Sequence, residues 1–354
     1  MSTPVTAARL PGWVHPAARR EALRRRAVTV PALWLALVGF TAALVVLVPA
    51  AVVVDLVRRV ASRRRPVALR LVLVGWAYLL AEAAGLVALA AIWLTAGRPG
   101  PARERRLLER TYVVQGWWAR SLFRAVTAAF GLRWSVSGAE EVAPGPVVVL
   151  MRHASIVDTL VPSVFLAAPH TLRLRYVLKR ELLRDPCLDV AGNRLPNCFV
   201  DRGGERSAEE VARVRALAEG LGPRDGVLIY PEGTRFSRDR LARVLGRMRQ
   251  SDPARAERFA ALRWVLPPRR GGTLALLDAA PEADVVVCVH HGLDGLARIG
   301  DVWGGSLVGR RIEVSFRRIP RVQVPAGPDR VEWLDEVWQA LDEWVADRVS
   351  PARG

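Results

Sequence analysis

His153 and Asp158 are the two residues whose types and spacing most directly suggest chemistry. A separation of five residues would place them roughly 140° apart on a continuous helix, so they meet only if the chain turns between them. The apolar run before His153 predicts a strand that ends there, and Ser155 with Asp158 resembles a capping box at the start of a helix. A histidine that a carboxylate orients can act as a general base. An Asp158 that only caps the helix fits the same spacing, so the pair alone leaves both interpretations open.

Two further segments follow strand-like runs and carry charged residues. Phe199 and Arg202 belong to the run Phe-Val-Asp-Arg, and residues 230–237 read Tyr-Pro-Glu-Gly-Thr-Arg-Phe-Ser. Proline and glycine predict an irregular loop in the second segment, where backbone N–H groups and Arg235 could bind an anion. Each segment alone could be a plain turn with a surface salt bridge, but the occurrence of all three motifs in this order argues against that interpretation.

Other common kinds of site are not expected. Lys179 has no glycine upstream that could form a phosphate loop, and the sequence contains neither Gly-x-Ser-x-Gly nor His-Glu-x-x-His. His290 and His291 are neighbours that would point apart on a strand, and the three cysteines have no Cys-x-x-Cys spacing. We therefore expect no metal site.

The elements that must position these residues alternate between strand-like and helical patterns. This alternation predicts an α/β fold with a mostly parallel central sheet flanked by helices, whose active loops converge at the carboxyl ends of the strands. Residues 329–348 place Val331, Leu334, Trp338, Leu341 and Val345 on one face, which predicts a C-terminal docking helix. The strand-like runs are 145–153, 173–183, 197–202, 226–233, 283–291 and 311–319, and the helical patterns between them are 155–167 and 207–221.

Two long apolar stretches precede the α/β part. No ionisable residue occurs from 27 to 54, and only Glu82 interrupts residues 71–97. A hydrocarbon core of ~30 Å needs ~20 apolar residues, so we expect residues 27–100 to form two transmembrane or hairpin helices. A basic tail at 1–26 would precede them and a domain at 101–354 would follow. Glu82 is expected to be protonated or paired with a neighbour.

Arginines flank both apolar stretches. Eleven lie before the first stretch or after the second, against six in the connector. If both stretches span the bilayer, this excess predicts an integral cell-membrane protein whose C-terminal domain faces the cytoplasm. A hairpin that enters and leaves the same leaflet also fits. Residues 115–133 have a helical pattern that fits either a helix packed on the core or an interfacial helix.

The net charge predicts anionic partners. Among 354 residues, 52 Lys and Arg against 34 Asp and Glu give +18. The arginines gather around the apolar stretches and no nucleic-acid recognition module is recognisable, so we expect membrane lipids and not nucleic acid.

Together the three motifs resemble those of the 1-acylglycerol-3-phosphate O-acyltransferase and related lysophospholipid acyltransferase family, over roughly residues 110–320. The sequence departs from the family pattern at Pro196 and Cys288, and residues 266–272 resemble a subgroup that acts on varied lysophospholipids. The matching positions are His153 and Asp158 of the His-x4-Asp motif, Phe199, Asp201 and Arg202 of the Phe-x-Asp-Arg motif, and Pro231, Glu232, Gly233, Thr234 and Arg235 of the Pro-Glu-Gly-Thr-Arg motif.

The resemblance implies a membrane-bound O-acyltransferase with a glycerolipid acyltransferase-like fold. It implies transfer of an acyl chain from acyl-CoA or acyl carrier protein to the hydroxyl of 1-acylglycerol-3-phosphate, giving phosphatidic acid, with no cofactor. Another lysophospholipid acceptor and a non-catalytic membrane-surface binding protein are the alternatives. Implied roles are catalysis for His153 and Asp158, and substrate binding for Phe199, Arg202, Glu232, Gly233, Thr234 and Arg235.

Overall fold

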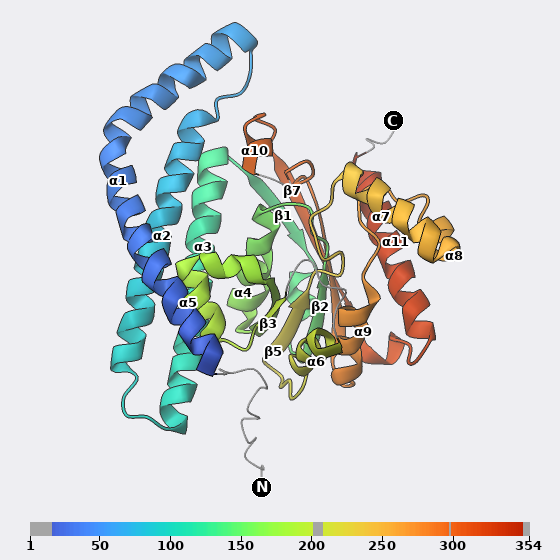
Figure 1. Cartoon of the computed structure of the whole chain (residues 1–354). Helices are drawn as coiled ribbons and strands as arrows, with labels where there is room; N and C mark the ends of the chain where they lie inside the picture. Colours follow the sequence, from blue (N-terminus) through green and yellow to red (C-terminus); the bar gives the residue numbers. More distant parts are fainter. Residues whose placement is uncertain (1–15, 201–207, 297–298, 350–354) are drawn as a thin grey trace.

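The computed structural model describes residues 16–200, 208–296 and 299–349. Its centre is a seven-stranded sheet in the order β1-β7-β6-β2-β5-β3-β4, in which only the β6–β7 pair is antiparallel. The prediction of a mostly parallel sheet flanked by helices is confirmed (Figure 1). The strands are β1 Arg133–Ser137, β2 Val147–Met151, β3 Arg173–Lys179, β4 Cys198–Val200, β5 Asp225–Ile229, β6 Asp284–His291 and β7 Arg311–Ile319.

The central strand β2 shows why such runs are apolar throughout. All five of its residues are buried, because side chains that alternate between the two faces of the sheet meet a helical layer on each side. Val148 and Leu150 enter one hydrophobic core, while Val147, Val149 and Met151 enter the other.

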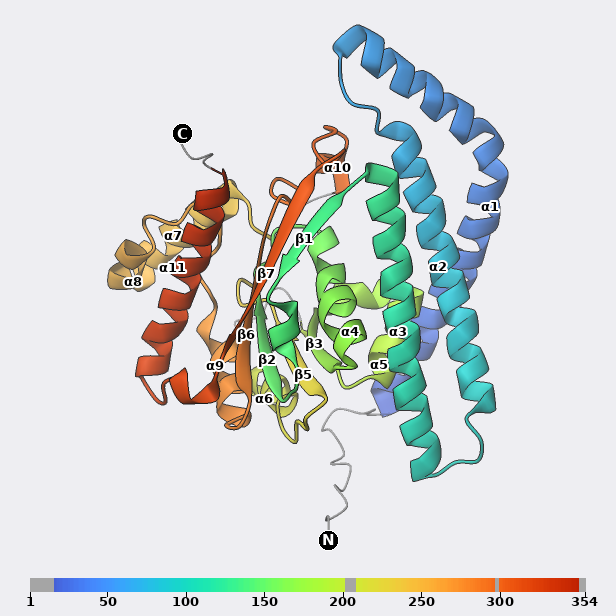
Figure 2. The ribbon, with the colours of Figure 1, turned by 180° about the vertical axis from the view of Figure 1, so that it is seen from behind.

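Helices cover both faces of the sheet, as the two opposite views show (Figures 1 and 2). The C-terminal helix buries Leu334, Trp338, Leu341 and Val345 in the core, along the face that the sequence indicates. On one side lie α1 Pro16–Ser62, α2 Ala68–Thr95, α3 Pro101–Phe130, α4 Ala168–His170 and α5 Pro186–Arg194; on the other lie α6 Ala208–Ala216, α7 Arg238–Ser251, α8 Pro253–Arg258, α9 Arg270–Ala279 and α11 Asp329–Val349. The short helix α10 spans Ile299–Val302.

Strand β1 is not among the strands expected from the sequence. The helical pattern assigned to 115–133 runs into it, but α3 ends at Phe130, and Gly131 closes the helix in the left-handed region at φ 64°. The next residues form an edge strand that pairs only with β7 and alternates between exposed and half-buried side chains. An edge strand with one half-buried face carries too little apolar signal to be separated from the end of a helix.

The helix over this region packs on the core, which was one of its two interpretations. Leu122 and Phe130 of α3 are buried, and Trp118 donates its indole N–H to Glu82 Oε1 of α2 at 2.7 Å. Glu82 is fully buried and also accepts from the backbone N–H of Cys187 at 3.1 Å, so it is paired as expected. It ties α2 and α3 to α5.

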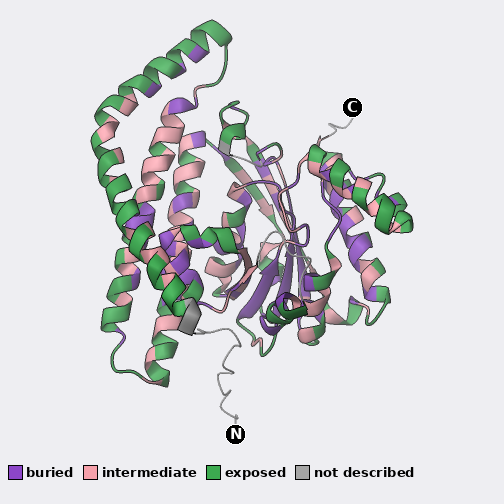
Figure 3. Cartoon of the chain, viewed as in Figure 1, coloured by how far each residue is buried: buried purple, intermediate pink, exposed green. Residues whose placement is uncertain are grey.

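Two helices are long and apolar enough to cross a membrane, over Arg19–Ser62 and Ala68–Thr95. The first leaves most of its apolar side chains exposed, as Figure 3 shows for α1. Leu35, Val45 and Val60 expose 75%, 79% and 75% of their surface. Contiguous exposed apolar surface of this kind is typical of a site that contacts another protein or a membrane.

Candidate active site

His153 and Asp158 meet at the carboxyl end of β2. His153 follows the strand, and Asp158 lies in the 3₁₀ turn Val157–Leu160. His153 Nδ1 is 3.0 Å from Asp158 Oδ1, and both side chains are buried. The predicted turn between them is therefore confirmed.

Asp158 also holds that turn, so both interpretations of the spacing apply at once. Its Oδ2 accepts the backbone N–H groups of Ala154 and Ser155, each at 2.7 Å, while Ser155 Oγ accepts from the N–H of Val157 at 3.1 Å. One carboxylate oxygen thus fixes the backbone, and the other orients His153.

A second histidine reaches the same carboxylate. His290 at the end of β6 is fully buried, with Nε2 3.3 Å from Asp158 Oδ2 and 3.3 Å from the carbonyl oxygen of Arg152. Burial alone would raise the pKa of Asp158, but His153 and His290 hold it well below its usual value. Asp158 is therefore ionised at neutral pH.

Sequence reasoning missed this role of His290, because it considered the residue only as half of a metal site with His291. The two do point apart, since His291 lies 3.4 Å from Asp294. The signal was a histidine at the end of an apolar run, but its partner depends on the β2–β6 pairing, in which Met151 faces Cys288. In the part of the chain that the structure describes, no cluster of three or more His, Cys, Asp or Glu side chains could hold a metal.

The loop after β5 fixes the backbone of His153 from both sides. Glu232 Oε1 accepts the His153 N–H at 2.9 Å, and the Phe236 N–H donates to the His153 carbonyl at 2.7 Å. Glu232 Oε2 accepts the Leu266 N–H at 3.0 Å. Burial raises the pKa of Glu232 to about 8, against the opposing effects of Arg152 and the two N–H groups. The Glu232 carboxylate is thus occupied by backbone, and any contribution to substrate binding comes through the loop that it holds.

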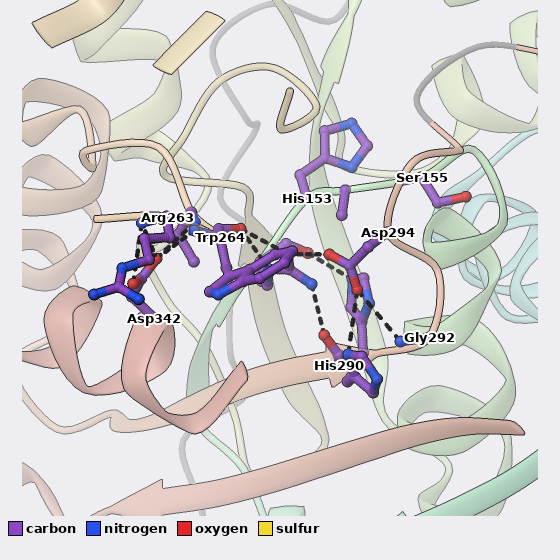
Figure 4. A network of polar contacts seen from close by, with 12 residues as sticks. His153, Ser155, Arg263, Trp264, His290, Gly292, Asp294 and Asp342 are labelled. Atoms are coloured by element: carbon purple, nitrogen blue, oxygen red, sulfur yellow. Dashed lines mark hydrogen bonds and ion pairs between the residues drawn. The ribbon is translucent and has the colours of Figure 1, made fainter. Parts of the chain in front are cut away.

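A buried arginine, Arg152, holds the segment that contains Leu266 and the end of β6. Arg152 is fully buried, donates to the carbonyl oxygens of Trp264 and His290 at 2.6 Å each, and pairs with Asp294. Asp342 of α11 accepts the N–H groups of residues 263–265 at 2.6–3.1 Å, as seen in Figure 4. The segment that bears Leu266 is therefore held by two charged groups, and through Glu232 it fixes His153.

His153 opens into a cavity of about 1690 Å³, called the central cavity below. The Tyr230 ring lies against the imidazole, with ring centres 4.4 Å apart. The rest of the lining divides by chemistry. Apolar side chains come from the three N-terminal helices and include Ala32, Leu33, Leu71, Val74, Leu122 and Val126. Charged side chains come mainly from the loops and α7. The basic ones are Lys179, Arg184, Arg235, Arg240, Arg243, Arg247, Arg255 and Arg269, and the acidic ones are Glu181, Asp185, Glu210 and Glu232.

The structure brings most of the expected site residues together. Gly233, Thr234 and Arg235 line the central cavity with His153. Gly233 has φ 68°, which favours glycine, and a Cβ there would lie 2.8 Å from Arg269 Nε, so a side chain would also displace Arg269. The Phe199 ring instead packs on Gly192 of α5, and Arg202 lies outside the described residues. No signal in the sequence marked Arg269, because arginine is abundant throughout.

Comparison with known proteins agrees with this site. The model of the family described as Acyltransferase matches residues 133–273, which contain His153, Asp158 and the loop 231–235. The 1-acyl-sn-glycerol-3-phosphate acyltransferase of Pseudomonas aeruginosa is 34% identical over 128 residues, which are 35% of this chain and 46% of that relative. The match thus spans about half the length of the curated relative.

The fold also has a counterpart among solved structures. The chain is similar to the 1-acyl-sn-glycerophosphate (LPA) acyltransferase PlsC from Thermotoga maritima, with a TM-score of 0.50 and 14% identity. The likeness covers 78% of this chain and 95% of that chain, and at this identity it concerns the fold alone.

Proposed function

We propose that the protein transfers an acyl chain from a thioester to the free hydroxyl of 1-acylglycerol-3-phosphate, giving phosphatidic acid, because the acyltransferase family model matches residues 133–273. The observation that carries the proposal is a histidine–carboxylate pair at the wall of a cavity lined on one part by apolar helices and on another by arginines. An amphiphile with an acyl chain and a phosphate has this pattern of chemistry. Another lysophospholipid acceptor shares the same features.

The dyad supplies general base catalysis. A hydroxyl is a poor nucleophile at neutral pH, and with Nδ1 hydrogen-bonded to Asp158, the His153 Nε2 accepts the hydroxyl proton as the oxygen attacks the thioester carbonyl. The carboxylate stabilises the imidazolium that forms. Collapse of the tetrahedral intermediate breaks the C–S bond, and the departing thiolate takes the proton back from His153. Proton transfer of this kind accelerates a reaction by about 10²–10⁴-fold.

Arg235 and the backbone of the loop 233–235 are the proposed contacts of the acceptor phosphate. The loop adjoins Glu232, which holds the His153 backbone, so a phosphate there lies a short molecular distance from the base. Guanidinium suits bidentate contact with phosphate. Arg202 is proposed to act with it, on the basis of the family resemblance.

The N-terminal helices are proposed to attach the protein to the cytoplasmic leaflet as a hairpin. Near one end of α1, Arg25 and Arg26 pair with the buried Asp189 of α5 at 2.7 and 2.9 Å. Near its other end, Arg58 donates to the Trp303 carbonyl at 2.7 Å. A bilayer-crossing helix has its ends on opposite sides of the bilayer, whereas both ends of α1 contact the same charged domain. The contacts therefore favour a hairpin over two full spans.

Labelling in sealed inside-out vesicles tests this topology. Arg64→Cys, in the connector between α1 and α2, should react with an impermeant maleimide from the cytoplasmic side, as should Val322→Cys, which is 94% exposed on the α/β part. The native cysteines are buried and give little background. Labelling of Arg64→Cys only from the opposite side would establish two full spans instead.

An assay with purified protein tests the activity. Labelled acyl-CoA and a panel of lysophospholipids should give phosphatidic acid with the wild type and none with His153→Ala. Membrane binding without product from any acceptor or donor would favour the non-catalytic alternative.

A further inference from the structure

His290 lies at the end of β6, the strand that pairs with β2 on the side of the histidine–carboxylate pair. Its side chain is fully buried, and Nε2 lies 3.3 Å from Asp158 Oδ2 and 3.3 Å from the carbonyl oxygen of Arg152. Both neighbours are acceptors, so a proton of the imidazole resides on Nε2. In the part of the chain that the structure describes, Nδ1 has no hydrogen-bond partner. His290 therefore presents a single N–H group to the Asp158 carboxylate and the Arg152 carbonyl.

The two oxygens of Asp158 have different surroundings. Oδ2 accepts the backbone N–H groups of Ala154 and Ser155 at 2.7 Å each and also faces the His290 N–H, whereas Oδ1 faces His153 Nδ1 at 3.0 Å. Each donor that approaches Oδ2 stabilises the carboxylate by itself, so the carboxylate depends less on a positive charge at His153. Removal of the His290 N–H would strengthen the attraction between Asp158 and protonated His153.

The other charged or titratable side chains around this group come from the ends of β2, β5 and β6. Arg152 pairs with Asp294, and Glu232 accepts two backbone N–H groups. Tyr230 and Cys288 are buried, and burial raises the pKa of both side chains above their ordinary values, so both are neutral at physiological pH. Among the described residues, none of these five side chains donates a hydrogen bond to Asp158.

We propose that His290 is a positioning residue that limits how strongly Asp158 stabilises protonated His153, and so extends the activity of the general base to lower pH. His290 does not line the central cavity and therefore acts through Asp158 without touching substrate. The inference rests on the proposed role of His153 in acyl transfer and adds a residue that sets the pH range of that role.

The pH dependence of kcat/KM in His290→Met and His290→Gln tests the proposal. The two side chains are similar in size, but only glutamine offers N–H groups to the two acceptors. In His290→Met the acid limb of the profile should move to higher pH by about one pH unit, which lowers kcat/KM on that limb about tenfold. The plateau above the limb should stay within about threefold of wild type. His290→Gln should restore the wild-type limb.

His170→Gln is the control, because it removes a histidine of α4 that lies outside the central cavity. Its profile should match that of the wild type. Three results would overturn the inference. Equal losses at every pH with an unmoved limb would make His290 purely structural, and a limb that moves to lower pH would mean that protonation of His290 itself inactivates the site. A limb that stays displaced in His290→Gln would show that the N–H group is not responsible.

An NMR titration of the full-length protein with isotope-labelled histidine gives a readout that needs no turnover. The chain has five histidines, and the His153 resonances are those lost in His153→Ala. The titration midpoint of His153 should lie about one pH unit higher in His290→Met than in wild type. An equal midpoint in the two proteins would reject the inference even in an active enzyme. Absence of transfer from every thioester to every lysophospholipid would reject the proposed function, whereas the displaced midpoint would still support the effect of His290 on Asp158.

Discussion

Asp158→Asn distinguishes the role of Asp158 in orienting His153 from its role in capping the turn. The hydrogen bonds around Asp158 fix the orientation that an asparagine side chain would take there. The Oδ2 position accepts two backbone N–H groups at 2.7 Å. An amide nitrogen there would face two donors, at a cost of about 1–3 kcal/mol for each unsatisfied group. The asparagine oxygen therefore takes this position, and its NH₂ group faces His153 Nδ1.

That orientation enforces the wrong histidine tautomer. Nδ1 must now accept a hydrogen bond, so the proton resides on Nε2, the atom that has to remove the hydroxyl proton. A tautomer change of this kind costs roughly 10⁴-fold in kcat in hydrolases with the same His–Asp relationship. We expect kcat of Asp158→Asn to fall about 10³–10⁴-fold with acceptor KM little changed. The melting temperature should fall only in part, since the capping hydrogen bonds remain while the charge that His153 and His290 stabilise is lost.

Steady-state kinetics and thermal unfolding of the purified protein measure both effects. Asp252→Asn is a matched control, since Asp252 caps α8 by accepting the Arg255 N–H at 3.1 Å and lies outside the central cavity. It should leave kcat unchanged. Turnover of Asp158→Asn within about threefold of wild type would mean that Asp158 is only a cap, and the proposed mechanism would fall.

The free energy of unfolding at acidic pH provides a second test of the role of Asp158. The pKa of Asp158 is lower in the folded protein than its ordinary value of 3.8, so the folded state favours the ionised form. Its contribution to the free energy of unfolding is fully present above about pH 3.8 and is lost as the pH falls through the lower folded value. The stability difference between wild type and Asp158→Asn should therefore narrow below pH 3.8 in urea titrations. A constant difference over that range would contradict the lowered pKa.

Three further changes test other parts of the site. Arg235→Ala should raise acceptor KM about 10–100-fold, with only partial recovery in Arg235→Lys, whereas an unchanged KM with a collapsed melting temperature would make the residue structural. His290→Phe removes a hydrogen-bond donor to Asp158 and should lower kcat about tenfold without changing acceptor KM; an unaltered kcat would show that the carboxylate is held well enough without it. Gly233→Ala should destabilise the fold by about 1–2 kcal/mol because of its φ of 68°, while Gly246→Ala, with open space inside α7, should stabilise it by about 0.5–1 kcal/mol; denaturant unfolding compares the two, and equal effects would argue against strain at Gly233.

The sequence by itself determined the features that depend on local pattern. Apolar runs of strand length, each followed by a helical period, led to the mostly parallel sheet, and the Ser155–Asp158 spacing led to the turn that brings Asp158 back to His153. The C-terminal docking face and the apolar character of α1 and α2 could also be predicted, because both depend directly on the types and spacing of the residues.

Only the tertiary structure decided which distant residues share a contact. The pairing of β6 with β2 places His290 against Asp158, and the segment held by Asp342 of α11 places Leu266 against Glu232. The tertiary structure also shows that Glu232 accepts the backbone N–H of His153 and that the Phe199 ring packs on Gly192. Contacts between elements depend on strand order and helix packing, which no local spacing encodes. For the same reason, only the fold separated the arginines that line the central cavity from the many that flank the apolar helices.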